Sequence, residues 1–248
     1  MAIELLKPEW GAQRPIRGVL FDMDGLVLDS EVLYTRFWRE AAQALGYPMT
    51  AEQSLGMRSL GKKHGQPYLE SLFGPGVDYT TIRSKRIELM DAYVARHGIA
   101  PKPGIYALMD YLEENHIAAA ITSSSPMESI RDHLSAVNLC HRFHKLCSGH
   151  DVPNGKPAPD IYLHGAAELG LRPEECLALE DSPTGILSAH RAGCLPVMIP
   201  DLDQPDAATR SLLYAKADSL TDILDLLKTA NGHPYGCPFA VSACQKSP

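Results

Sequence analysis

The hydrophobic and polar positions divide this chain into two kinds of segment. In one kind, four to six apolar residues stand together between polar turns, which is the pattern of a strand buried on both faces. In the other kind, apolar residues recur at intervals of three and four, which is typical of a helix. The predicted strands cover residues 18–24, 117–122, 145–148, 176–180 and 195–199.

The predicted helices fall into two blocks. In the second half of the chain, they alternate with strands and cover residues 104–115, 126–137, 158–169 and 183–192. Short apolar strands between helices predict a parallel sheet with helices on both faces. Between residues 30 and 97, the pattern predicts helices beginning near Ser30, Thr50, Lys63 and Thr80, and no strand.

The helical block interrupts the α/β pattern directly after the first strand. We therefore predict a doubly wound α/β core, residues 1–29 and 98–230, with a small all-helical domain, residues 30–97, inserted into it. The Pro/Gly-rich return at residues 101–104 and the short entry at residues 25–29 are typical of hinges.

The two ends of the chain carry weaker patterns. Residues 1–17 are interpreted as a loose lead-in. The tail, residues 231–248, holds Gly, Pro, Cys and Ser without periodicity, and its role is unknown. Its two cysteines, Cys237 and Cys244, are compatible with a disulfide but do not argue for one.

Composition and charge narrow the classes of protein. A chain of 248 residues that is 45% hydrophobic is long enough for a core domain with an insert. No apolar run approaches the roughly 20 residues of a membrane span, and the N-terminus lacks the pattern of a signal peptide. We therefore expect a cytoplasmic protein without a membrane partner, either a monomer or a weak dimer.

The formal net charge of −7 argues against a nucleic-acid partner, because the field of the protein repels phosphates. An anionic substrate would therefore require local cations. The six cysteines include no Cys-x-x-Cys pair, which argues against a zinc ribbon. Cys147, Cys176 and Cys194 lie in or beside apolar runs and are expected to be reduced thiols of the core.

The strongest chemical signal is the pair of aspartates, Asp22 and Asp24, that ends the first strand and is followed at once by Gly25. Buried carboxylates are costly unless a cation or a reaction requires them. Two residues apart on an extended segment, they share one face. One can therefore attack a substrate while the other transfers a proton.

Polar residues also follow three other predicted strands. Ser123 and Ser124 follow the second, a loop with Lys156 follows the third, and Glu180 and Asp181 end the fourth. In a parallel sheet, all carboxyl ends lie at one edge. We therefore expect these side chains to meet Asp22 and Asp24 at a single site.

This set of residues suits phosphoryl transfer. Asp22 would be the nucleophile that forms an aspartyl phosphate, and Asp24 would protonate the leaving oxygen and then deprotonate the hydrolytic water. Ser123 would donate a hydrogen bond to the phosphoryl oxygens, and Lys156 would neutralise charge between nucleophile and phosphate.

Backbone and metal contacts complete the predicted site. The backbone around Met23, Gly25 and Ser124 would bind the phosphoryl group. Glu180 and Asp181 would form a Mg²⁺ site of hard oxygen ligands together with Asp22 and the carbonyl of Asp24.

The chain resembles the haloacid dehalogenase (HAD) superfamily of aspartate-nucleophile phosphotransferases from about residue 17 to residue 228. The segments that carry the resemblance are 21–25, 122–124, 155–160 and 179–185. The resemblance implies Mg²⁺, the roles given above, a Rossmann-like core and a helical cap that closes over the substrate. Thr122 and Ser123 both fit the hydroxyl position of the family, and Ser123 is preferred because Pro126 then falls three residues later.

Individual residues distinguish among the functions that this family resemblance allows. Asp24 argues against the dehalogenase branch, which lacks this residue. Mutases similar to β-phosphoglucomutase typically carry a histidine where Tyr34 stands and Lys-Asn where Pro126 and Met127 stand, so a phosphatase is preferred. A mutase remains an alternative, as does a non-catalytic binding module, although such a module would be expected to lack Asp22 or Lys156.

Two segments bear on the substrate. Residues 25–34 and 154–157 resemble the pseudouridine-5'-phosphatase group, which suggests a nucleoside or sugar phosphate as the small phosphorylated substrate. In the helical block, residues 54–63 resemble a substrate-facing cap loop, so Arg58, and with it Lys62 or Lys63, is a candidate substrate contact.

Overall fold

The computed structural model describes residues 3–7, 16–58, 60–201 and 203–231. They belong to two compact units: the core unit, Met1–Val27 with Pro101–Pro248, and the cap unit, Leu28–Ala100. Most of the tail, including Cys237 and Cys244, lies outside the described residues. Within the described part, we find no helix with the length and apolar character needed to cross a bilayer.

The core unit contains a seven-stranded sheet in the order β1-β7-β6-β5-β2-β3-β4. Its strands are β1 Glu4–Leu5, β2 Gly18–Phe21, β3 Ala118–Ser123, β4 Lys145–Ser148, β5 Cys176–Glu180, β6 Leu195–Met198 and β7 Ala215–Lys216. The pairs from β7 to β4 are parallel, and β1 joins β7 antiparallel at the edge. Every strand predicted from the apolar runs is present.

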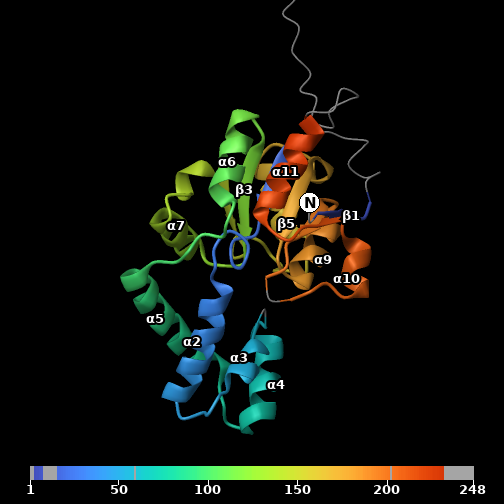
Figure 1. Cartoon of the computed structure of the whole chain (residues 1–248). Helices are drawn as coiled ribbons and strands as arrows, with labels where there is room; N and C mark the ends of the chain where they lie inside the picture. The colour runs from blue at the N-terminus through green and yellow to red at the C-terminus, as the bar shows by residue number, and fades with distance from the viewer. Residues whose placement is uncertain (1–2, 8–15, 59, 202, 232–248) are drawn as a thin grey trace, which may run out of the picture. The chain divides into compact units, whose positions relative to one another are not determined.

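The helices of this unit are α6 Ile105–Glu114, α7 Met127–Ala136, α8 Asp160–Glu168, α9 Pro183–Ala192, α10 Ala207–Leu212 and α11 Leu220–Asn231 (Figure 1). Leu20 of β2 packs in one buried cluster with Tyr162 of α8 and Ala189 of α9. Phe21, the next residue, points to the other face, where its ring meets Phe143 edge-on at 5.5 Å. Burial on both faces confirms the predicted doubly wound α/β core.

The N-terminal prediction was wrong for residues that the structure describes. Glu4 and Leu5 form β1 and pair with Lys216 and Ala215 of β7, instead of belonging to a loose lead-in. Both strands are only two residues long. Such short strands leave no periodicity in the sequence, and their pairing depends on a partner more than 200 residues away.

The cap unit is helical, as predicted, with α2 Glu31–Ala44, α3 Ala51–Leu55, α4 Lys62–Phe73 and α5 Tyr79–His97. Thr50 and Gln53 form the predicted capping box at the start of α3. Trp38 of α2 and Ile82 of α5 belong to the buried cluster that holds these helices together.

Candidate active site

The turn after β2 presents Asp22. The backbone N–H of Asp22 donates to the carbonyl of Leu179 at 3.0 Å, so the ladder between β2 and β5 continues to this residue. The chain then turns, and the N–H of Val27 donates to the carbonyl of Met23 at 3.0 Å. Gly25 has a φ of 81°, a conformation that favours glycine. The aspartate is therefore held at the strand end by backbone geometry.

Lys156 is the cation of this site. Its Nζ donates to Asp22 Oδ1 at 2.5 Å, to Glu180 Oε1 at 2.6 Å and to the carbonyl of Thr122 at 3.1 Å. An ammonium group has three protons, so each finds an acceptor. The side chain of Lys156 is 9% exposed, and the loop after β4 thus delivers a buried positive charge to the ends of β2, β3 and β5.

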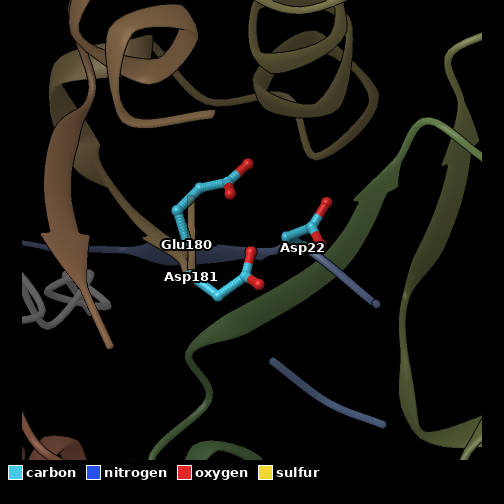
Figure 2. Close-up of side chains that lie close together, drawn as sticks. All are labelled: Asp22, Glu180 and Asp181. Atoms are coloured by element: carbon cyan, nitrogen blue, oxygen red, sulfur yellow. The ribbon is translucent and has the colours of Figure 1, made fainter. Parts of the chain in front are cut away.

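Three carboxylates meet at the same place (Figure 2). Asp22, Glu180 and Asp181 each offer one oxygen, and these oxygens lie within 4.8 Å of one another. Carboxylate oxygens are the ligands that Mg²⁺ prefers, and the separation allows a shared cation. The three residues therefore fit the predicted metal.

The charges of the site favour a bound cation. Burial, together with the neighbouring Glu180 and Asp24 and against the opposing effect of Lys156, raises the pKa of Asp22 to about 8. Burial alone would lower the pKa of Lys156, but Asp22 and Glu180 outweigh that effect and raise it. Lys156 is thus a permanent cation, and one lysine does not offset the carboxylates around it.

Asp24 lies at the same strand end with a different partner. Its Oδ2 accepts a hydrogen bond from the hydroxyl of Ser125 at 2.9 Å. The hydroxyl of Ser123 accepts from the backbone N–H of Ser125 at 3.1 Å, which leaves the hydroxyl proton of Ser123 available to an acceptor. Ser125 thus brings the end of β3 into contact with Asp24, as expected for neighbouring strand ends.

Thr122 and Ser123, the two candidates for the hydroxyl that binds the phosphoryl group, face opposite sides of β3. Thr122 donates from Oγ1 to the carbonyl of Phe21 at 3.2 Å and is fully buried. A side chain on Gly165 of α8 would collide with the methyl group of Thr122, so Thr122 faces that helix. Ser123, the next residue on β3, faces the other way, which supports the preference for Ser123.

Tyr162 and Ser125 were not among the sequence candidates. Tyr162 lies in the first turn of α8 and donates from its hydroxyl to Glu180 Oε1 at 2.5 Å. Ser125 holds Asp24, as described above. In the sequence, Tyr162 occupies an apolar position of a helix and Ser125 belongs to a serine run, so neither pattern indicates a partner that is distant along the chain.

The candidate substrate contacts from residues 54–63 belong to the cap unit. Arg58 lies in the turn after α3, where its Nε donates to the carbonyl of Leu55 at 3.0 Å. Lys62 and Lys63 are exposed in the first turn of α4. Their contact with substrate stays a prediction.

Comparison with known proteins gives a consistent result. Hexitol phosphatase A of Escherichia coli (strain K12) is 33% identical to the chain, over 79% of this chain and 91% of that protein. A probable pseudouridine-5'-phosphatase of Drosophila melanogaster is 29% identical, over 91% and 96%. The beta-phosphoglucomutase of Bacillus subtilis (strain 168) is 26% identical, over 73% and 82%.

The model of the haloacid dehalogenase-like hydrolase family matches residues 19–199. This span begins in β2, ends just after β6 and includes Asp22, Asp24, Ser123, Lys156, Glu180 and Asp181. The match confirms the resemblance found in the sequence, and this chain belongs to the haloacid dehalogenase-like hydrolases.

Proposed function

We propose that this chain is a Mg²⁺-dependent phosphatase that removes phosphate from a small phosphorylated metabolite through an aspartyl-phosphate intermediate. One observation carries the proposal: Lys156 Nζ lies between Asp22 Oδ1 and Glu180 Oε1, at 2.5 and 2.6 Å, with Asp181 beside them. A buried carboxylate next to a permanent cation and a set of metal-type ligands is suited to meet a phosphate.

The nucleophile in the proposed reaction is Asp22. Its carboxylate attacks phosphorus, the bond to the leaving oxygen breaks, and the phosphoryl group passes to Asp22. Lys156, already at hydrogen-bond distance from Asp22, stabilises the charge on the transferring group. When bound by Asp22, Glu180 and Asp181, Mg²⁺ adds positive charge that offsets the repulsion between carboxylates and phosphate.

Asp24 is assigned the proton transfers. It gives a proton to the leaving oxygen and then takes one from the water that hydrolyses the aspartyl phosphate. The hydrogen bond from the hydroxyl of Ser125 to Oδ2 supports this assignment, because it holds the carboxylate of Asp24 at the strand end beside Asp22. Ser123 donates its hydroxyl proton to a phosphoryl oxygen, with the backbone of Met23, Gly25 and Ser124 around the same group.

The relatives and the cap unit both bear on the class of substrate. The named relatives include phosphatases of hexitol phosphates and of pseudouridine 5'-phosphate, which favours a sugar, polyol or nucleoside phosphate. We assign substrate selection to the cap unit, where Arg58 with Lys62 or Lys63 offers positive charge. Pseudouridine 5'-phosphate is the first compound to compare.

The test measures phosphate release from a panel of sugar, polyol and nucleoside phosphates, with Mg²⁺ and with chelator. We expect release that requires Mg²⁺, and Asp22→Asn should lower kcat by about 1,000-fold or more because it removes the nucleophile. Asp151→Asn, the same change at an exposed aspartate after β4, is the matched control and should leave kcat unaltered. Full activity of Asp22→Asn would refute the proposal.

The same panel separates the alternatives. A mutase would form glucose 6-phosphate from β-glucose 1-phosphate faster than free phosphate appears. A binding module would show saturable binding of a phosphorylated compound without any turnover. Ranking substrates by kcat/KM then identifies the preferred class, because this ratio measures discrimination.

A further inference from the structure

Tyr162 is a polar group at the site that the proposed reaction does not use. It lies on α8 with 0% of its surface exposed, and its hydroxyl donates to Glu180 Oε1 at 2.5 Å. A tyrosine hydroxyl is costly to bury unless it finds a partner, and a carboxylate is a strong one. At a core position without a polar partner, phenylalanine would pack as well as tyrosine. The hydroxyl of Tyr162 therefore requires an explanation.

The carboxylate that receives this bond is restrained on several sides. Glu180 is 1% exposed, and its Oε1 also accepts from Lys156 at 2.6 Å. Its Oε2 accepts from the hydroxyl of Ser182 at 3.2 Å. A Cβ on Gly185 would lie 1.9 Å from Glu180 Cδ, so a side chain there would displace the carboxylate. The surroundings thus select one orientation of Glu180.

Tyr162 also contacts the other member of the ion pair. The Nζ of Lys156 lies 5.2 Å from the centre of the Tyr162 ring, within the range of a cation–π interaction. The ring therefore contacts Lys156 while the hydroxyl holds Glu180. Since Lys156 also donates to Asp22 at 2.5 Å, Tyr162 lies one residue removed from the nucleophile.

We propose that Tyr162 is a positioning residue, which fixes Glu180 by its hydroxyl and thereby holds Lys156 against Asp22. Without the hydroxyl, Glu180 Oε1 keeps only its bond from Lys156, and the carboxylate loses one of the two donors that fix this oxygen. Lys156 then loses part of its alignment with Asp22. This inference rests on the proposed function, in which Lys156 stabilises the transferring phosphoryl group.

The test is Tyr162→Phe, which removes one oxygen and keeps the ring and the packing of α8. We expect kcat to fall about tenfold with KM within about threefold, because alignment of Lys156 acts on the transition state. Glu180 also belongs to the acidic group, so the Mg²⁺ dissociation constant, measured by calorimetry without substrate, should rise about threefold or more.

The matched control is Tyr106→Phe. The hydroxyl of Tyr106 on α6 donates to the carbonyl of Val137 at 2.8 Å, so this change also removes one tyrosine hydrogen bond. We expect its kcat and Mg²⁺ dissociation constant to equal those of the wild type. An equal fall in both variants would reduce Tyr162 to a structural role and overturn the proposal.

A double-mutant cycle with Glu180→Gln tests whether Tyr162 acts through Glu180. Tyr162→Phe should change kcat and Mg²⁺ affinity by less than about twofold when Glu180→Gln is already present. Two outcomes would overturn the proposal. In one, Tyr162→Phe lowers kcat by the same factor whether or not Glu180→Gln is present. In the other, Tyr162→Phe has the kcat and the Mg²⁺ dissociation constant of the wild type. A wild type that releases no phosphate would instead refute the proposed function, and the Mg²⁺ measurements would still decide the role of Tyr162.

Discussion

At the scale of single residues, two glutamates are buried in the part of the core unit that the structure describes, and they serve different purposes. Glu180 lies at the candidate active site and binds Lys156. Glu175, 7% exposed, lies at the opposite end of β5 and accepts from the backbone N–H of Arg172 at 3.0 Å and from Arg17 at 3.4 Å. The second glutamate ties the start of β5 to the start of β2 and is expected to serve stability alone.

Glu175 gives a prediction about pH and stability. Hydrogen bonds from the backbone and side chain of Arg172 lower the pKa of Glu175 below its ordinary value of 4.5. A lowered pKa means that the stabilisation is fully present above pH 4.5 and is lost as the pH falls through the pKa of the folded state. Glu175→Gln should therefore lower the free energy of unfolding by about 1 kcal/mol at pH 7 and by less below pH 4.5.

Urea unfolding between pH 3 and 8 measures this difference. Glu174→Gln is the control, because its contact with Arg172 is longer, at 3.6 Å, and more exposed. A pH-independent loss of stability in Glu175→Gln would show that shape rather than charge matters at this position.

The sequence predicted some residues of the candidate active site and missed others. Asp22, Asp24, Lys156 and Asp181 follow strands and Glu180 ends one, and a carboxylate or lysine at the end of an apolar run is conspicuous. Tyr162 and Ser125 carry no such signal, because tyrosine is ordinary in a buried helix and serine is ordinary in a turn. Only the contact with Glu180 or Asp24 distinguishes them.

At the scale of elements, helix ends were predictable where capping residues mark them. Helix α9 spans Pro183–Ala192, the range predicted from the sequence. Ser182 caps it by accepting from the N–H of Gly185 at 3.1 Å, and Gly193 ends it with a φ of 83°. Strand β7 has only two residues and no such marks. Local chemistry therefore predicted α9, whereas β7 depends on pairing.

Helix α5 of the cap unit carries a buried arginine in an aromatic setting. Arg86 is 8% exposed, and its guanidinium lies 4.6 Å from the ring centre of Tyr34 and 5.4 Å from that of Trp38. Its Nε has no hydrogen-bond partner among the described residues. The packing of the long side chain, rather than an ion pair, is expected to stabilise the cap unit here.

This arrangement predicts different results for two substitutions. Arg86→Met keeps the length of the side chain and should leave the free energy of unfolding within about 1 kcal/mol of the wild type. Arg86→Ala leaves a cavity beside Tyr34 and Trp38 and should cost about 2 kcal/mol. Chemical unfolding of both variants compares the values, and an equal loss in both would mean that the charge on the rings is the main contribution.

At the scale of the whole molecule, the chain closes its sheet with its own N-terminal segment. Strand β1 covers the edge of β7, and the N–H of Leu6 donates to the carbonyl of Tyr214 at 2.9 Å. An uncovered edge strand offers unpaired backbone groups to other chains. The short antiparallel pair is therefore expected to limit association as well as to add stability.

Deleting residues 1–7 tests this function of β1. We expect a melting temperature lower by roughly 4 °C and increased light scattering on heating, because the edge of β7 becomes available. Arg210→Ala is the control, since it removes only the exposed ion pair with Glu4 and should behave as the wild type. A deletion variant with an unchanged melting temperature and no added scattering would contradict this view of the edge.

The sequence by itself determined the order of the elements, the α/β class with a helical insert, and the strand ends that carry Asp22, Glu180 and Asp181. These features depend on periodicity and capping, which act over a few residues. Only the tertiary structure decided which atoms meet. The bond from Lys156 to Asp22 joins residues 134 positions apart, and β1 pairs with a strand at the other end of the chain. Contacts of this kind depend on the packing of distant elements, which no local pattern records.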